Sequence, residues 1–263
     1  MCLSDLMPCA RSSRSWAARR WPGRTAAWRG ARVSDLAQGF AEALRLLGAG
    51  DRELWAIILR TLAISGLATV LAMVAGVPLG YAVARGRFPG RTGLLALVNT
   101  GMGMPPVVVG LVVWLLLTRS GPLGGLDLIY TRRAMVLAQF FIATPLVVGF
   151  TAASVQALPA QLPDLLATLG AGPMRTLWIM SREAKLGLLA AVMAGFGAIV
   201  SEVGASMTVG GNLRGSTRVL TTAIVTETSR GNLPVALALG LVLLLLAFAV
   251  NLLLTVLQQR RDR

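Results

Sequence analysis

The sequence contains no histidine, and its two cysteines, Cys2 and Cys9, both lie within the first ten residues. These absences exclude histidine-based acid–base catalysis and any His/Cys metal site from the rest of the chain. The sequence also lacks a GxxxxGK[ST] loop, so the chain does not bind ATP in that manner by itself. No pair of carboxylates stands at a helical spacing that suits acid–base work or metal binding. We therefore expect no catalytic residue, no metal and no cofactor.

Acidic residues and lysine are also scarce. The chain has 11 Asp and Glu against 25 Lys and Arg, a formal net charge of +14, and Lys185 is the only lysine. In a soluble protein this excess of arginine would suggest nucleic acid as a partner. Here 55% of the residues are hydrophobic and only 14% are charged. Because the arginines lie beside apolar runs, we interpret them as signals for membrane orientation and expect no nucleic acid.

Five apolar runs are near or above the roughly 20 residues that cross a bilayer. They cover residues 55–84, 93–118, 134–157, 186–207 and 235–257. We predict an all-α membrane protein with about five transmembrane helices, in one membrane domain at 51–259. Prolines inside the runs predict kinks, which membrane helices tolerate; they are Pro78, Pro105, Pro106 and Pro145. Small residues in the runs allow either close helix packing or a hinge; they include Gly66, Gly76, Gly80, Gly195 and Gly197.

Two segments precede the first run. Residues 1–33 are rich in arginine, serine and tryptophan, a composition typical of a disordered tail. Three interpretations stay open: a translation start assigned too far upstream with the true start near Val33, an authentic basic tail, or a transit peptide. In residues 34–50, Leu36, Phe40, Leu44 and Leu47 recur at helical spacing. We expect an amphipathic helix in the membrane interface there, ended by Gly48-Ala49-Gly50.

The basic residues give a slight preference for one orientation. The connections 85–91 and 158–185, together with the residues after 257, hold nine Lys and Arg. The connections 119–133 and 208–234 hold six. The positive-inside rule then places 158–185 in the cytoplasm. The arginines of residues 1–33 would lie outside against that rule, a conflict that a start near Val33 mostly removes.

The segment between the third and fourth runs is longer than a simple connection needs to be. Pro163 and the aspartate after it favour the start of a short helix at Asp164–Leu169. This helix is expected to stop at Gly170-Ala171-Gly172, because glycine readily adopts the left-handed conformation that ends helices. Pro173 then starts a second helix, predicted to run on into 186–200. We interpret the segment as a surface built to dock on a partner.

The stretch DLLATLGAG at 164–172 resembles the cytoplasmic coupling loop of bacterial ABC importer permeases. In that family the pattern is Glu-Ala-Ala, three residues, and an almost fixed glycine. Gly170 falls on the glycine and Asp164 on the glutamate, while Leu165 and Leu166 replace the alanines. Arg182-Glu183 stands where the family usually has Leu-Pro. The continuation, REAKLGLLAAVMAGFGAIVSEVGASMTVGGNLRGSTRVLTTAIVTETSRGNLPVALALG, is similar to the tungstate branch of the molybdate/tungstate permeases. The resemblance covers roughly residues 34–259.

This resemblance implies a type I ABC importer permease architecture with a cytoplasmic coupling helix, multi-pass in the bacterial plasma membrane. It implies a permease subunit for tungstate or molybdate that is not itself an enzyme. The expected partners are an ABC ATPase subunit, a periplasmic or extracellular substrate-binding protein, a second copy in a homodimer, and membrane lipid. The ATPase would contact the coupling loop: Asp164, Leu165, Leu166, Ala167, Leu169, Gly170, Ala171 and Gly172. The alternative is a permease of this architecture for another solute, such as sulfate or an amino acid.

A secondary transporter or a membrane-embedded enzyme is disfavoured. The first usually shows internal repeats and paired ionisable residues in its spans, and the second would need a histidine or clustered acids. The sequence has none of these.

Polar residues near the end of the fourth run are candidates for the pathway or its gate. Glu202 is either a gate residue or, as we favour, a group that hydrogen-bonds to a neighbouring helix, because an ionised carboxylate would repel an anion. Ser201, Ser206 and Thr208 are the better pathway candidates. In the glycine-rich connection that follows, Arg214 and Arg218 form either a solvated loop or a contact for the binding protein. The turn at Gly231–Pro234 is a further candidate for that contact.

Overall fold

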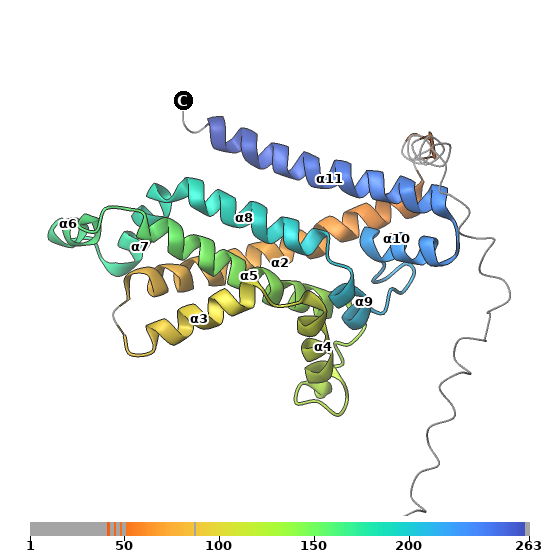
Figure 1. The fold of residues 1–263 in the computed structure, drawn as a ribbon, viewed down its shortest axis with the longest axis horizontal. Helices are drawn as coiled ribbons and strands as arrows, with labels where there is room; N and C mark the ends of the chain where they lie inside the picture. The colour runs from red at the N-terminus through yellow and green to blue at the C-terminus, as the bar shows by residue number, and fades with distance from the viewer. Residues whose placement is uncertain (1–40, 43–44, 46–47, 49–50, 87, 261–263) are drawn as a thin grey trace, which may run out of the picture.

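The computed structural model of the protein describes residues 41–42, 45, 48, 51–86 and 88–260. Within these residues every regular element is a helix (Figure 1), which confirms the predicted all-α class. In chain order the elements are α2 (Arg52–Arg85), α3 (Arg91–Met102), α4 (Pro106–Leu117), a 3₁₀ turn η1 (Gly124–Leu126), α5 (Arg132–Gln156), α6 (Leu162–Thr168), α7 (Pro173–Glu183), α8 (Lys185–Val200), α9 (Gly204–Gly210), α10 (Leu220–Ser229) and α11 (Leu233–Arg260).

Three of the five predicted spans are single long helices. Among the described residues, α2, α5 and α11 are the helices that are individually long and apolar enough to cross a membrane. They confirm the predicted spans at 55–84, 134–157 and 235–257. Pro78 and Pro145 lie inside α2 and α5 without ending either helix. Including broken spans, the described chain has up to five crossings.

The runs predicted as spans at 93–118 and 186–207 are each interrupted, and the first interruption falls at the prolines predicted to kink it. The first run breaks between α3 and α4, which are bent by 105°, because Pro105 and Pro106 supply no N–H for a continuing helix. In the second run, α8 ends at Val200 and a separate helix, α9, begins at Gly204. The predicted continuation of the helix at Pro173 into 186–200 is also interrupted, since α7 and α8 are bent by 78°.

The centre of the protein is the packing of α2 against α5. Two glycines one helical turn apart on α2 allow the close approach: a Cβ on Gly76 would lie 2.7 Å from Val147 Cγ1, and one on Gly80 would lie 2.7 Å from Thr151 Cβ. Small residues at this spacing let two membrane helices come together. The close-packing interpretation therefore applies to Gly76 and Gly80. By contrast, no atom lies within 4 Å of a Cβ built on Gly66 or Gly197.

Helix α10 lies in a stretch that the sequence analysis treated as a connection. It is too short and too polar to be detected as an apolar run, yet Leu220 and Ala223 on it are buried. Both pack with Leu54, Ile57 and Leu239 from α2 and α11. The helix therefore exists because neighbouring elements bury one of its faces.

Helices α6 and α10 lie toward opposite ends of the molecule (Figure 1). At the end that carries α6, called here the α6 end, Arg85 on α2 donates to the carbonyl of Leu158 at 3.0 Å. At the end that carries α10, the α10 end, Arg132 on α5 donates to the carbonyl of Ser216 at 2.9 Å. The first bond joins the connection 85–91 to the connection 158–185, and the second joins 119–133 to 208–234. The positive-inside count grouped the connections in the same way.

Two predictions concern the start of the chain. The tail at 1–33, with its proposed start near Val33, lies outside the described residues. Of the predicted interfacial helix at 34–50, the structure describes Ala41, Glu42, Arg45 and Gly48, and all four are helical.

Candidate functional site

At the α6 end, the short helix α6 terminates in a complete Schellman motif. Gly170 has φ of +76°, in the left-handed region. Its N–H donates to Ala167 O at 3.0 Å, and the next N–H, on Ala171, donates to Leu166 O at 2.9 Å. These two bonds satisfy carbonyls that a helix end leaves free. The predicted stop at Gly170 is confirmed, and it requires a residue that tolerates positive φ.

Leu166 anchors α6 to the membrane helices. It is 8% exposed and packs in a cluster with Ala84 of α2, Val155 of α5 and Met180 of α7. Ala171 packs against the same cluster, which adds the hydrophobic contact that accompanies a Schellman motif. Arg85 also stabilises this junction, because its guanidinium donates to the carbonyls of Val155 and Leu158 around the end of α5. The short helix is therefore fastened to α2, α5 and α7 together.

Several large apolar side chains of this segment are exposed. Leu165 is 56% exposed, Leu169 75%, Met174 77% and Trp178 60%. Arg182 lies over the ring of Trp178, with 5.4 Å between its guanidinium carbon and the ring centroid. Several exposed large apolar side chains within one short segment, called here the apolar patch, are typical of an interaction site. Of the eight predicted coupling residues, Leu166 is buried, Ala171 is half-buried, and the other six are exposed: Asp164, Leu165, Ala167, Leu169, Gly170 and Gly172.

A cavity of about 780 Å³ lies beside the apolar patch. Helices α7 and α8 line most of it, and Met73 of α2 and Gln258 of α11 complete it. Its polar lining includes Arg182 and Lys185. This cavity therefore opens at the same end as the segment 158–185.

The predicted pathway residues lie at the break between α8 and α9. The hydroxyls of Ser201 and Thr208 donate to carbonyls one turn earlier, Gly197 O and Gly204 O, both at 2.9 Å. Ser206 differs from them: it is 1% exposed, and its hydroxyl has no hydrogen-bond partner. The structure therefore places the three hydroxyls on one short stretch, but none of the three residues lines the 780 Å³ cavity.

Glu202 does not form the hydrogen bond to a neighbouring helix that the sequence analysis favoured. Its carboxylate accepts from Ala205 N at 2.9 Å, within its own stretch of chain. The side chain thus satisfies a free N–H at the start of α9, where a carboxylate is favourable. Its backbone carbonyl, in contrast, accepts from Thr221 of α10 at 3.1 Å. The carboxylate caps α9, and the contact to another helix comes from the backbone.

At the α10 end, the connection between α9 and α10, loop 211–219, is tightly organised around Thr217. This side chain is fully buried, donates to Gly210 O at 2.6 Å and accepts from Leu213 N at 2.9 Å. Gly211, Asn212 and Gly215 all have positive φ, so the loop follows a sharply turning path. The glycine-rich sequence is therefore an ordered turn, although much of its surface is exposed.

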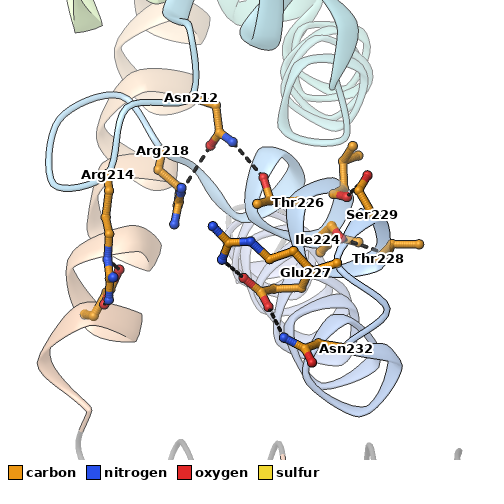
Figure 2. A network of polar contacts seen from close by, with 12 residues as sticks. Asn212, Arg214, Arg218, Ile224, Thr226, Glu227, Thr228, Ser229 and Asn232 are labelled. Carbon is orange, nitrogen blue, oxygen red and sulfur yellow. Dashed lines mark hydrogen bonds and ion pairs between the residues drawn. The ribbon is translucent and has the colours of Figure 1, made fainter.

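Arg214 and Arg218 are both engaged within this end of the molecule. Arg214 forms an ion pair with Glu53 at the start of α2, and this hydrogen bond raises the pKa of Arg214 above its ordinary value. Arg218 donates to Asn212 Oδ1 at 3.2 Å, and Asn212 in turn donates to Thr226 of α10 at 2.7 Å. Figure 2 shows these bonds and, as a separate group, the bond that Asn232 donates to Glu227 of α10. The solvated-loop interpretation is incomplete, because both side chains have partners in the fold.

Arg60 was missed by the sequence analysis. It lies inside the first span, is 8% exposed, and donates from Nη1 to Arg218 O at 2.9 Å. A charged residue inside an apolar run is expensive and points to a functional or structural role. The signal was present in the sequence, because Arg60 is the only charged residue in the run at 55–84.

Comparison with known proteins identifies relatives over most of the chain. The family described as binding-protein-dependent transport system inner membrane component matches residues 76–263. The tungstate uptake system permease protein TupB of Peptoclostridium acidaminophilum is 38% identical over 224 residues, covering 85% of this chain and 98% of that protein. A probable anion ABC transporter permease protein of Haloferax volcanii is 40% identical over 196 residues, covering 73% of this chain and 84% of the relative.

The fold also resembles a solved transporter. A chain of the MetNI methionine ABC transporter, in an inward-facing conformation, superposes with a TM-score of 0.55. The match covers 79% of this chain and 98% of the other, at 18% sequence identity. It supports the type I importer permease architecture and says nothing about substrate.

Proposed function

Because this chain belongs to the family of binding-protein-dependent transport system inner membrane components, we propose that it serves an importer of a tetrahedral oxyanion, with tungstate first and molybdate second. The chain is a membrane-spanning permease subunit and not itself an enzyme, like its relatives, and ATP hydrolysis belongs to a separate subunit. The observation that supports the substrate is the relative named for tungstate uptake, which aligns along almost its whole length. The anion transporter relative supports the same chemical class.

The ATPase subunit docks on the α6 end, which is then cytoplasmic. This proposal is supported by the exposed apolar face of Leu165, Leu169, Met174 and Trp178, for which the described chain offers no cover. Residues 164–172 form the central part of the dock. The binding protein approaches the α10 end, where Arg214, Arg218 and the turn at Gly231–Pro234 are the candidate contacts.

Movement of the ATPase reaches the spans through the anchor of α6. Leu166 connects the short helix to α2, α5 and α7 in one packed cluster, and packed side chains transmit displacement because interiors are dense. Closure of the ATPases would move α6 as a rigid lever and rock the spans between inward-open and outward-open states. The helices are already interrupted at two bends, one between α3 and α4 and one between α7 and α8. In the proposed movement these bends are the places where the helices can change their angle.

The pathway lies between two copies of the chain in a homodimer surrounded by membrane lipid. Ser201, Ser206 and Thr208 are its candidate polar residues, and Glu202 is a candidate gate only through its position at the α8–α9 break. The unpartnered hydroxyl of Ser206 supports the choice of this stretch, because buried polar groups without partners are rare in folded proteins.

The test is transport in reconstituted vesicles containing the permease, its ATPase and its binding protein. Uptake of tungstate, molybdate and sulfate is measured with and without ATP inside the vesicles. We expect ATP-dependent uptake of tungstate and molybdate and much less of sulfate. Clear preference for sulfate, or uptake of none of the three, would contradict the proposed substrate. Equal uptake of tungstate and molybdate leaves the proposal standing and assigns their discrimination to the binding protein.

A further inference from the structure

Three arginines from three elements converge on loop 211–219 at the α10 end. Arg60 of α2 donates to Arg218 O at 2.9 Å, and Arg132 at the start of α5 donates to Ser216 O at 2.9 Å. Both acceptors are backbone carbonyls two residues apart, so the two guanidinium groups are drawn to the same short stretch. Arg218 itself is half-buried in that stretch. Arg132 and Arg218, and the carboxylate of Glu53 with the opposite sign, are all close enough to Arg60 to act on it electrostatically.

The positive charge of this cluster is not neutralised by ion pairs. In the part of the chain that the structure describes, no carboxylate lies within ion-pair distance of Arg60, Arg132 or Arg218. Glu53, the nearby acid on α2, is paired with Arg214. Arg60 is more than nine-tenths buried, and its one hydrogen bond uses one of its five N–H donors. Among the described residues, the three guanidinium groups therefore have no carboxylate paired directly with them.

The surroundings offer space and further donors. A cavity of about 420 Å³ is lined by Arg132 together with Arg133, Thr131 and Ser216, whereas Arg60 and Arg218 do not line it. The cavity contains one carboxylate, Asp127, against two guanidinium groups. Helix α5 starts at Arg132, so its first N–H groups and the positive end of its dipole lie at this place. Each of these features favours an anion, except Asp127, which opposes it.

We propose that Arg60, Arg132 and Arg218 form a receiving site for a tetrahedral oxyanion at the α10 end of the permease. The inference rests on the proposed function, because it assigns a place to the substrate dianion. Guanidinium groups match the oxygens of a tetrahedral oxyanion with two parallel N–H donors each. Arg132 and Arg218 supply the accessible donors. Arg60, which is buried, adds positive charge and holds the loop through its bond to Arg218 O. The binding protein releases the ion to this site. The ion then moves from the site into the membrane-spanning part of the permease.

A purely structural role of these arginines makes a different prediction. If Arg60 and Arg132 only fasten loop 211–219, their removal loosens the loop without affecting ion affinity in a folded protein. The receiving site requires that the two more accessible side chains, Arg132 and Arg218, change ion affinity even when the fold is intact. These two variants therefore decide the question, and Arg60→Lys is added because it keeps the charge while losing the planar donor group.

The experiment measures binding of sodium tungstate by equilibrium dialysis, with tungsten quantified by elemental mass spectrometry. The sample is the full-length permease with its ATPase in lipid nanodiscs, without binding protein and at low salt. The variants are Arg132→Gln, Arg218→Gln and Arg60→Lys. Arg230→Gln is the matched control, because Arg230 lies at the same end, is exposed, and pairs with Glu227 at 2.9 Å away from the cluster. Thermal unfolding of each sample reports whether the fold is retained.

We expect saturable binding by the wild type that weakens as salt is added. Arg132→Gln and Arg218→Gln should each bind at least about tenfold more weakly, the loss expected for a hydrogen bond to a charged group. Arg230→Gln should bind like the wild type. Absence of wild-type binding, or equal binding by the wild type and the two glutamine variants, would overturn the site. If vesicles still take up tungstate in that case, the receiving site fails while the proposed function stands; if wild-type vesicles take up none, the proposed function fails.

Discussion

The two ends of this protein hold their exposed segments by different physical means. At the α6 end, apolar contacts around Leu166 and a Schellman motif at Gly170 hold the short helix. At the α10 end, hydrogen bonds from Arg60, Arg132 and Thr217 to backbone carbonyls hold loop 211–219. Apolar packing suits a helix that must move with the spans as one body. Hydrogen bonds, which are directional, suit a loop that keeps charged side chains in place at a solvent-exposed surface.

The largest expected effect is the loss of the apolar anchor. Leu166→Ala removes a side chain that is 8% exposed, so it should destabilise the attachment of α6 by about 2–5 kcal/mol. Trypsin cleavage after the exposed Arg175 should then accelerate at least about tenfold, because local opening becomes more frequent. The control is Leu165→Ala, the exposed neighbour, which should leave cleavage unchanged while weakening binding of the ATPase. Equal cleavage of both variants would show that Leu166 is no anchor.

The corresponding change at the α10 end is Thr217→Val. The substitution keeps the shape of a fully buried side chain but removes two hydrogen bonds, to Gly210 O and from Leu213 N. Leaving those groups unpaired should cost about 1–3 kcal/mol, seen as a lower thermal unfolding midpoint in detergent. The control is Ser216→Ala on the exposed part of the same loop, where the hydrogen bonds of Ser216 use its backbone and not its side chain. A midpoint for Thr217→Val equal to that of the control would contradict the described loop.

Gly170→Val tests the turn that ends α6. A β-branched residue at φ of +76° is strained by about 1–2 kcal/mol, although no atom within 4 Å would clash with its Cβ. We expect the strain to shift α6 against its partner, so that ATP hydrolysis continues while substrate uptake falls. Gly172→Ala is the matched control, because Gly172 has φ of −70° and equally open space. Normal coupled uptake by Gly170→Val at wild-type abundance would refute the assignment of 164–172 as the dock.

The smallest effect is expected from the ion pair between Glu53 and Arg214. Both side chains are exposed, and exposed ion pairs contribute little once water and salt screen them. Because the pair raises the pKa of Arg214, any stabilisation is present below that pKa and is lost only as pH rises through it, far above neutrality. Glu53→Gln should therefore leave the thermal unfolding midpoint unchanged from pH 6 to 8. A decrease as large as that of Thr217→Val would show that the pair holds the loop.

Much of the fold was predictable because its signals are local. The runs that became α2, α5 and α11 are long and apolar, and the stop of α6 depends on Gly170 alone adopting positive φ. The break at Pro105 and Pro106 was signalled by the prolines, but the sequence did not distinguish a kink from a bend of 105°. Helix α10 was missed because its stability comes from contacts with α2 and α11, which lie far away in the sequence.

The candidate sites also divide into features with local signals in the sequence and features that depend on distant segments. The short helix of the proposed coupling segment and the glycine that ends it were predictable, since both depend on residues that are adjacent in the chain. The arginine cluster was not found as a cluster, because Arg60, Arg132 and Arg218 are separated by more than 70 and 80 residues. Glu202 was assigned the wrong partner, since its acceptor role depends on a helix start at Gly204 that no apolar pattern marks.

The sequence by itself determined the membrane class, the approximate positions of the long spans, the short helix before Gly170 and the membership of a permease family. These follow from composition, from runs of apolar residues and from motifs that act over a few residues. Only the tertiary structure decided which face of α6 is buried, where the fourth span breaks, and which arginines meet at loop 211–219. Those outcomes depend on packing between distant segments, where Gly76 and Gly80 let α2 approach α5 and so bring Arg60 and Arg132 to the same end of the molecule.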